Sequence, residues 1–186
     1  ASGPGATNAI TGIATAFMDS IPMVVISGQV QSHLIGTDAF QETDMIGVSR
    51  PIVKHSFTVD KQENIAQIVK EAFHIATSGR QGPVVIDVPK DLTNPDELFD
   101  FNYPEKANIR SYNPPVKPEN HQVSRAVDAI LNAERPVIYA GGGTISSNAS
   151  DELRELNELL DFPVTNTLMG LGVYPGTGKR LSLIHI

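Results

Sequence analysis

Residues 83–89, Pro-Val-Val-Ile-Asp-Val-Pro, decide the fold of this 186-residue chain. An almost unbroken apolar run of this length, bounded by proline, is typical of a strand buried on both faces of a parallel sheet. Residues 23–28, Met-Val-Val-Ile-Ser-Gly, form a second such run. Between the two, residues 62–78 carry apolar side chains at helical spacing, and Gly79 ends the pattern. Strand, helix and strand in this order predict a parallel sheet with helices on both faces.

The flanking residues extend this first unit in both directions. Residues 8–20 carry apolar side chains at helical spacing, and residues 53–59 are a further candidate strand. From residue 93 to residue 118, prolines interrupt every possible element. We therefore expect a first domain over residues 1–92 and a linker over residues 93–118 that lies along the surface.

A second unit of the same kind follows this linker. Apolar spacing and glycine positions predict alternating helices and strands, over residues 123–131, 136–140, 151–160 and 162–167. The fold class expected is therefore α/β, with two doubly wound parallel-sheet units. The second unit, residues 119–180, is expected to be truncated before its sheet closes.

Composition excludes several classes of function. The net charge of −7 provides no basic excess for nucleic-acid binding. No apolar run approaches the roughly 20 residues needed to span a bilayer, and no signal segment is visible. The absence of Cys excludes disulfides and thiolate metal sites, and the His residues are scattered. We expect a cytoplasmic protein without a nucleic-acid partner, a membrane partner or a metal site of its own.

The last six residues, Leu-Ser-Leu-Ile-His-Ile at 181–186, differ from the rest of the chain. A transposon-end adapter used in DNA library preparation encodes this same hexapeptide. We expect residues 181–186 to be a non-native tail and leave them out of the fold, with a native amphipathic tail as the alternative. Because the chain also begins without Met, inside a Gly-Pro-Gly turn, an internal fragment of a longer protein is expected.

Three glycine-rich segments lie where helices or turns begin. Residues 3–8, Gly-Pro-Gly-Ala-Thr-Asn, could bring backbone close to an anionic ligand, although on spacing alone an ordinary tight turn is the more frequent explanation. Residues 141–143 and 167–172 follow the two strands of the second unit. The three consecutive glycines lack the spacing of a dinucleotide fingerprint, and a turn without ligand is the alternative. Two such loops at neighbouring strand ends nevertheless favour a ligand crevice.

Several charged residues have simpler interpretations. Asp38, Glu42 and Asp44 lack the spacing of a calcium loop, so we interpret them as a solvated acidic patch. His55 is expected to be an ordinary strand residue. Lys90 lies just beyond the carboxyl end of a predicted strand, where functional side chains collect in open sheets. An exposed surface lysine is the alternative.

Read in order, the motifs of this chain resemble the large catalytic subunits of acetolactate synthases, a family of thiamine-diphosphate enzymes. The most specific block is residues 35–44, Ile-Gly-Thr-Asp-Ala-Phe-Gln-Glu-Thr-Asp. The resemblance extends from Ala1 to about Arg180. The other matching segments are residues 2–8, 18–22, 27–30, 47–55, 79–84, 87–91, 141–143 and 168–172.

The resemblance implies a function for the longer parent protein. The first unit would be the C-terminal part of the pyrimidine-binding domain, and the second the N-terminal part of the central FAD-binding domain. The parent would decarboxylate pyruvate on thiamine diphosphate and transfer the two-carbon unit to a second 2-oxo acid. The products would be acetolactate or acetohydroxybutyrate, for branched-chain amino-acid biosynthesis. The thiamine-activating glutamate and the Mg²⁺-binding domain would lie outside residues 1–186, so the fragment alone is expected to be inactive.

The resemblance also assigns roles to individual residues. Pro4, Asn8 and Gln41 would lie near the thiamine pyrimidine, and Gln41 would be catalytic. The FAD site would comprise Ser20, Arg80, Gly141, Gly142, Gly143, Thr167, Leu168 and Met169. The substrate channel would be bordered by Ala39, Phe40, Lys54 and Lys90. The alternative for Gln41 is that it only caps the short helix after its loop. The loop at Gln31 and His33 departs from the form common in plant members, which leaves inhibitor sensitivity open.

Partners and rival functions follow from the same resemblance. A homodimer or tetramer of large subunits is implied, together with a small regulatory subunit and small 2-oxo acid substrates. A sister enzyme such as glyoxylate carboligase or pyruvate oxidase is one alternative. A noncatalytic flavin-binding module is the other.

Overall fold

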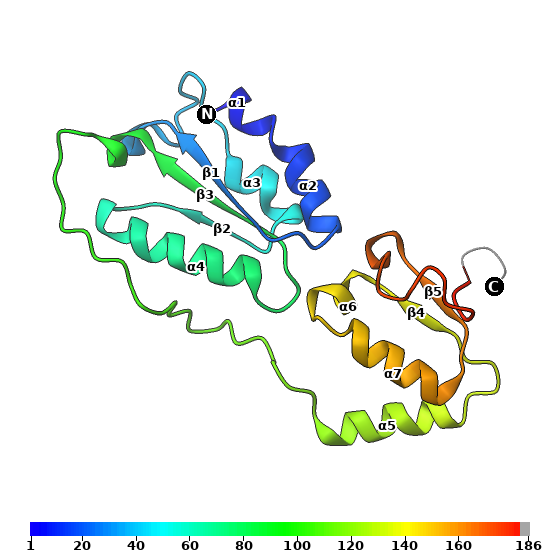
Figure 1. Ribbon diagram of the computed structural model, residues 1–186. Helices are drawn as coiled ribbons and strands as arrows, with labels where there is room; N and C mark the ends of the chain where they lie inside the picture. Colours follow the sequence, from blue (N-terminus) through cyan, green and yellow to red (C-terminus); the bar gives the residue numbers. More distant parts are fainter. Residues whose placement is uncertain (183–186) are drawn as a thin grey trace. The chain divides into compact units, whose positions relative to one another are not determined.

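The computed structural model describes residues 1–182. The chain divides into a first unit, Ala1–Val116, and a second that begins at Lys117 (Figure 1). Each unit holds its own parallel sheet, so the predicted α/β class with two parallel-sheet units is confirmed.

The sheet of the first unit has three parallel strands, with β3 (Pro83–Pro89) between β1 (Met23–Gln29) and β2 (His55–Thr58). β1 lies beside β3 along its whole length, from the pair Met23 and Pro83 to the pair Gln29 and Pro89. Val84, Val85 and Ile86 are at most 1% exposed, because β3 has a neighbour on each edge and helices on each face. This burial explains why the β3 sequence is almost continuously apolar.

Helices cover both faces of this sheet, as Figure 1 shows. Side chains alternate along a strand, so Val84 and Ile86 pack against α4 (Ile65–Thr77) on one face. Val85 points to the other face, where it packs among Ile13 of α2 (Ile10–Met18) and Met45 of α3 (Met45–Ser49). The one-turn helix α1 (Pro4–Thr7) joins this second cluster through Ala6.

Some predicted boundaries differ from those observed. The helix predicted over residues 8–20 is observed as the shorter α2, and the one-turn helix α1 that precedes it was not predicted. β2 is shorter than the strand predicted over residues 53–59. α3 was not predicted, because five residues are too few to establish a helical period. Short 3-10 helices complete the chain: η1 (Ser32–Leu34), η2 (Arg50–Ile52), η3 (Gln62–Asn64), η4 (Lys90–Thr93) and η5 (Leu168–Gly170).

The proline-rich segment after η4 lies along the first unit. Ile109 and Tyr112 pack against the hydrophobic cluster that contains α4, and the Lys70 ammonium lies 5.0 Å from the centre of the Tyr103 ring. The division between the two units falls after Val116, close to the end of the linker predicted over residues 93–118.

The second unit contains α5 (Asn120–Leu131), β4 (Ile138–Ala140), α6 (Gly142–Ser146), α7 (Ser150–Leu160) and β5 (Val164–Asn166). β4 and β5 are parallel neighbours and are shorter than predicted, while α6 was missed because it begins within the glycine run. After η5 the chain returns beside β5, where the Val164 N–H donates to the Arg180 carbonyl at 2.9 Å. Of the tail expected to be non-native, Leu181 and Ser182 pair with Val164, and residues 183–186 lie outside the described residues.

Candidate functional site

The turn at the start of α1 lies directly against Gln41. Gly3 has a backbone φ of 53° and ψ of −127°, a conformation that glycine alone adopts readily. A side-chain carbon at Gly3 would lie only 2.8 Å from the carbonyl carbon of Gln41. The Gly3–Pro4 turn and Gln41 are therefore neighbours in space, although they are far apart in the chain. Asn8 is the exposed C-cap residue of α1.

The loop that carries Gln41 is folded around the Glu42 side chain. The Glu42 carboxylate accepts hydrogen bonds from the N–H groups of Gly36 and Ala39, and these bonds lower the pKa of Glu42. Asp38 and Gln41 have positive φ values of 59° and 64°, a left-handed conformation that is uncommon for residues other than glycine. The loop therefore holds backbone strain beside the residue expected to be catalytic.

Two of the three acidic residues of this loop also bind backbone, a structural role that the interpretation as a solvated patch did not include. Glu42 binds loop backbone, and Asp44 caps α3 by accepting from the Gly47 N–H at 2.7 Å. The cap of α3 is thus Asp44 and not Gln41. Within residues 1–182, no group of three or more His, Asp or Glu side chains is placed to hold a metal ion.

The loop and the end of β3 present several exposed side chains at the carboxyl edge of the sheet. The Phe40 side chain is 90% exposed and Gln41 is exposed beside it, while Ala39 is half-buried. Lys90 is exposed at the first position of η4, just beyond β3, and contributes to a hollow of about 540 Å³. Ser2, Ile26 and Val88 line the same hollow, which is predominantly apolar.

A buried polar network lies beneath this loop and was not predicted. Asp87, which is 2% exposed, accepts hydrogen bonds from Ser27 Oγ and, at 2.9 Å, from Gln29 Nε2. Gln29 Nε2 also donates to the Thr43 carbonyl at 2.8 Å. Burial raises the pKa of Asp87 against the opposing effect of the two hydrogen bonds. The sequence signal was present, because an aspartate within an apolar strand needs buried partners.

The other predicted residues of the first unit lie at the opposite, amino edge of the sheet. Arg80 Nε donates to Ser20 Oγ at 2.9 Å, so two residues assigned to FAD are in direct contact. Ser20 lies just before β1, and Arg80 just before β3.

Lys54 also lies at the amino edge, and the structure does not bring it together with Ala39, Phe40 or Lys90. Its ammonium donates to the Ile75 carbonyl, to the Ser78 carbonyl at 2.6 Å and to the Tyr112 hydroxyl at 2.9 Å. These contacts engage the three donors that an ammonium has. Lys54 therefore caps the carboxyl end of α4 and holds the proline-rich segment against it.

In the second unit, the two glycine-rich loops lie against each other at the carboxyl ends of β4 and β5. The Thr167 N–H donates to the Ala140 carbonyl at 2.9 Å. A side-chain carbon at Gly142 would lie 3.0 Å from the Met169 Cβ atom, so glycine is needed for this approach. Gly143 has open space where a side chain would be, and α6 begins at Gly142 without a side-chain cap. Leu168 is exposed beside them.

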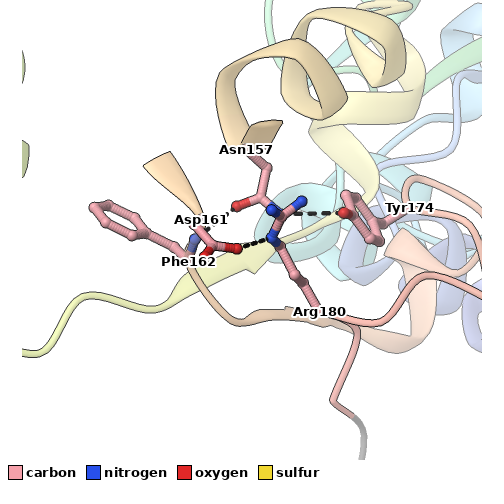
Figure 2. A network of polar contacts seen from close by, with 5 residues as sticks. All are labelled: Asn157, Asp161, Phe162, Tyr174 and Arg180. Carbon is pink, nitrogen blue, oxygen red and sulfur yellow. Dashed lines mark hydrogen bonds and ion pairs between the residues drawn. The ribbon is translucent and has the colours of Figure 1, made fainter. Parts of the chain in front are cut away.

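Figure 2 shows the polar network that fixes the segment after these loops. The side chain of Asn157 on α7 is fully buried; its amide donates to the Tyr174 hydroxyl at 3.2 Å and accepts from the Phe162 N–H at 3.1 Å. Arg180 donates to the Asp161 carboxylate. The network ties residues 174–180 to α7, and sequence reasoning did not identify it.

One buried acceptor of the second unit has no partner within the described residues. The Oδ1 atom of Asn166 lies at the end of β5, immediately before Thr167. A buried carbonyl oxygen without a donor is uncommon in folded proteins. A hydrogen-bond donor from a bound molecule would satisfy it, and Asn166 was absent from the residues expected from sequence.

None of the helices among the described residues combines the length and apolar character needed to cross a membrane.

Comparisons with known proteins identify both units. Residues 1–48 match the family of the N-terminal TPP-binding domain of thiamine pyrophosphate enzymes, and residues 123–182 match that of the central domain. The chain is 64% identical over 176 residues to an acetolactate synthase large subunit from Buchnera aphidicola subsp. Acyrthosiphon pisum. It is 55% identical over 179 residues to the acetolactate synthase large subunit of Haemophilus influenzae. It is 54% identical over 179 residues to the acetolactate synthase isozyme 3 large subunit of Escherichia coli.

These alignments cover 95% or 96% of this chain but only 31% of each relative. The chain thus spans less than a third of the length of the curated relatives that it matches.

Proposed function

We propose a function from one premise: this chain belongs to the family of acetolactate synthase large subunits, which are thiamine-diphosphate enzymes. The protein that contains it would decarboxylate pyruvate and transfer the two-carbon unit to a second 2-oxo acid. The products would be acetolactate or acetohydroxybutyrate. The observation that carries this proposal is the identity of 54–64% to acetolactate synthases over nearly the whole chain.

Gln41 is proposed to act on the substrate. Its side-chain amide can both donate and accept, so it could bind a substrate carbonyl oxygen and a hydroxyl formed from it. The proximity of the Gly3–Pro4 turn supports this role, because the segments assigned to the thiamine pyrimidine then meet at one place. Thiamine diphosphate, when bound, supplies the electron sink that decarboxylation of a 2-oxo acid requires. Pro4 and Asn8, at the two ends of α1, are proposed to contribute to the same thiamine site.

Phe40, Ala39 and Lys90 are proposed to border the path of the substrate. The exposed Phe40 ring provides an apolar wall that keeps water from the reacting carbon. Lys90 provides a positive charge beyond β3 that attracts the carboxylate of a 2-oxo acid. Lys54 is left out of this proposal, because its ammonium donors are already used within the first unit.

FAD is proposed to bind at the second unit. The bare backbone at Gly141, Gly142 and Gly143 leads into the uncapped first turn of α6, an arrangement that suits phosphate oxygens. The unpartnered Asn166 oxygen beside Thr167, Leu168 and Met169 suits a donor group of the same ligand. The bare glycine backbone and the unpartnered Asn166 oxygen therefore both fit bound FAD. Ser20 and Arg80 are also proposed to bind FAD, and the hydrogen bond between them holds the Arg80 guanidinium in place.

The remaining parts of the proposal concern the longer protein. Residues 1–92 would belong to the pyrimidine-binding domain, residues 93–118 to a linker and residues 119–180 to the FAD domain. Mg²⁺ would be bound by a domain outside this chain. The name "large subunit" given to the relatives supports a smaller partner subunit, which is proposed to be regulatory. An assembly of two or four large subunits in the cytoplasm completes the proposal.

Product analysis with the full-length protein tests the function. The protein is incubated in air with pyruvate, inorganic phosphate, thiamine diphosphate, Mg²⁺ and FAD, with and without 2-oxobutyrate. A parallel incubation contains glyoxylate in place of pyruvate. We expect acetolactate from pyruvate alone and acetohydroxybutyrate when 2-oxobutyrate is added. Acetyl phosphate as the product would assign the protein to the pyruvate oxidases instead, and turnover of glyoxylate alone to the glyoxylate carboligases. Flavin binding without any product would support a noncatalytic module.

A further inference from the structure

Gln41 is held in a strained conformation from two directions. On one side, the Gly3 turn lies against its backbone so closely that no side chain fits between them. On the other side, Thr43, two residues later, has its carbonyl oxygen bound by the side chain of Gln29. The left-handed backbone at Asp38 and Gln41 persists only if such contacts determine the shape of the loop.

The buried, hydrogen-bonded side chain of Gln29 is suited to holding the loop in this shape. Its side chain is 7% exposed, and its amide group makes three hydrogen bonds. The nitrogen donates to the Thr43 carbonyl and to Asp87, and the oxygen accepts from the Val30 N–H at 2.9 Å. Asp87 is in turn bound by Ser27, which is 4% exposed. The amide therefore cannot rotate without leaving a buried group unsatisfied, which makes the network rigid.

We propose that Gln29, held by Asp87 and Ser27, is a positioning residue for Gln41. It links the carboxyl ends of β1 and β3 to the loop through the Thr43 carbonyl, and so sets where the Gln41 amide points. This inference rests on the proposed function and adds to it a residue that would touch neither substrate nor cofactor. Errors of about 1 Å in the placement of a reacting group cost about 100-fold in rate, so a rigid support for the loop has a direct effect on turnover.

A double-mutant cycle on the full-length protein separates positioning from general stability. The variants are Gln29→Met, which keeps the side-chain volume but removes the hydrogen bonds, Gln41→Ala, and the two together. We expect each single variant to lower turnover about 10- to 100-fold. If Gln29 acts through Gln41, the double variant is no slower than Gln41→Ala alone, because the two residues form one unit.

The matched control is Ile75→Val, which weakens the hydrophobic cluster between α4 and the sheet and does not alter the Gln29 network. We expect it to lower the melting temperature without changing turnover per folded molecule. If Gln29→Met destabilises too strongly, Gln29→Asn serves instead, because its shorter amide cannot reach Asp87 and Thr43 together. Losses that multiply in the double variant, or a Gln29 variant with normal turnover, would overturn the proposal.

Hydrogen exchange of the backbone in residues 36–44 gives a readout that needs no turnover. We expect faster exchange in Gln29→Met and unchanged exchange in Ile75→Val; unchanged exchange in both would overturn the positioning role. If the unaltered protein makes no acetolactate, the proposed function fails, yet the exchange data still decide whether Gln29 holds the loop.

Discussion

Replacing Gly3 by alanine perturbs the contact that brings the α1 turn and Gln41 together. Gly3 has φ 53° and ψ −127°, which is outside the regions that residues with a Cβ atom normally adopt. The added methyl group would also meet backbone rather than a movable side chain, because its nearest neighbours are the backbone atoms of Gln41. The substitution therefore has two separate costs at one position.

The size of each cost follows from this geometry. A residue other than glycine in so sparsely populated a conformation costs about 1–3 kcal/mol. The new carbon would overlap the Gln41 carbonyl oxygen most closely and would lie 2.8 Å from the carbonyl carbon, whereas ordinary contacts begin at 3.4 Å. Relieving this overlap, by at least about 0.6 Å, is an overpacking defect of about 1–3 kcal/mol. We expect the free energy of unfolding to fall by about 2–6 kcal/mol and turnover to fall with it, because the Gln41 backbone must move.

The assay compares Gly3→Ala with Gly12→Ala in the full-length protein, by urea unfolding and by acetolactate formation per folded molecule. Gly12 lies in α2, where an added methyl group would have nothing within 4 Å, so alanine there removes a helix-weakening glycine. We expect Gly12→Ala to raise the free energy of unfolding by up to about 1 kcal/mol and to leave turnover unchanged. Equal stability and equal turnover of Gly3→Ala and the unaltered protein would refute the contact between Gly3 and Gln41.

Three further substitutions have defined outcomes. Arg80→Ala should reduce flavin retention after gel filtration, since a charge-assisted hydrogen bond is worth about 1.5–3 kcal/mol once it is desolvated; unchanged retention would give Arg80 a structural role. Lys54→Met should lower the free energy of unfolding by about 1–3 kcal/mol, because the carbonyls at the end of α4 lose their donor. The KM for pyruvate should not change, and a raised KM would instead place Lys54 in the substrate channel. In the folded state the pKa of Asp87 is raised above its ordinary value of 3.8, so folding favours the protonated carboxyl. The resulting contribution to the free energy of unfolding is fully present below pH 3.8 and is lost as pH rises through the pKa of the folded state. The stability of the unaltered protein should therefore fall relative to that of Asp87→Asn, which does not titrate, as pH rises from about 4 to neutral in thermal melts. A difference between the two proteins that does not change with pH would contradict this account.

Local sequence was sufficient for the long elements of the fold. β3 and α4 were predicted because a strand buried on both faces must be apolar throughout, and a helix on a sheet must be apolar along one face. α3 and α6 were not predicted, since five residues show no period and their ends are set by contacts with neighbouring loops. Position in the sequence singled out the glycine-rich loops and Lys90, but only the resemblance assigned residues to the thiamine, FAD and substrate sites.

The grouping of Lys54 with Lys90 came from the resemblance and not from the predicted strands. In a parallel sheet, a residue at the start of one strand and a residue after the end of another lie at opposite edges, and the observed strand pairing places the two lysines in this way. The contacts of the acidic residues could not be predicted, because Glu42 and Asp44 bind backbone N–H groups whose positions depend on the folded loop.

By itself the sequence determined the fold class, the two units and the family, because apolar periodicity and motif order are properties of neighbouring residues. Only the tertiary structure decided that Gly3 meets Gln41, that Gln29 and Asp87 support the loop, and that Asn157 fixes the segment around Tyr174. These contacts join residues that are distant in the chain. They form because packing the helices on the sheets buries polar groups, and each buried group must then find its partner wherever the folded backbone provides one.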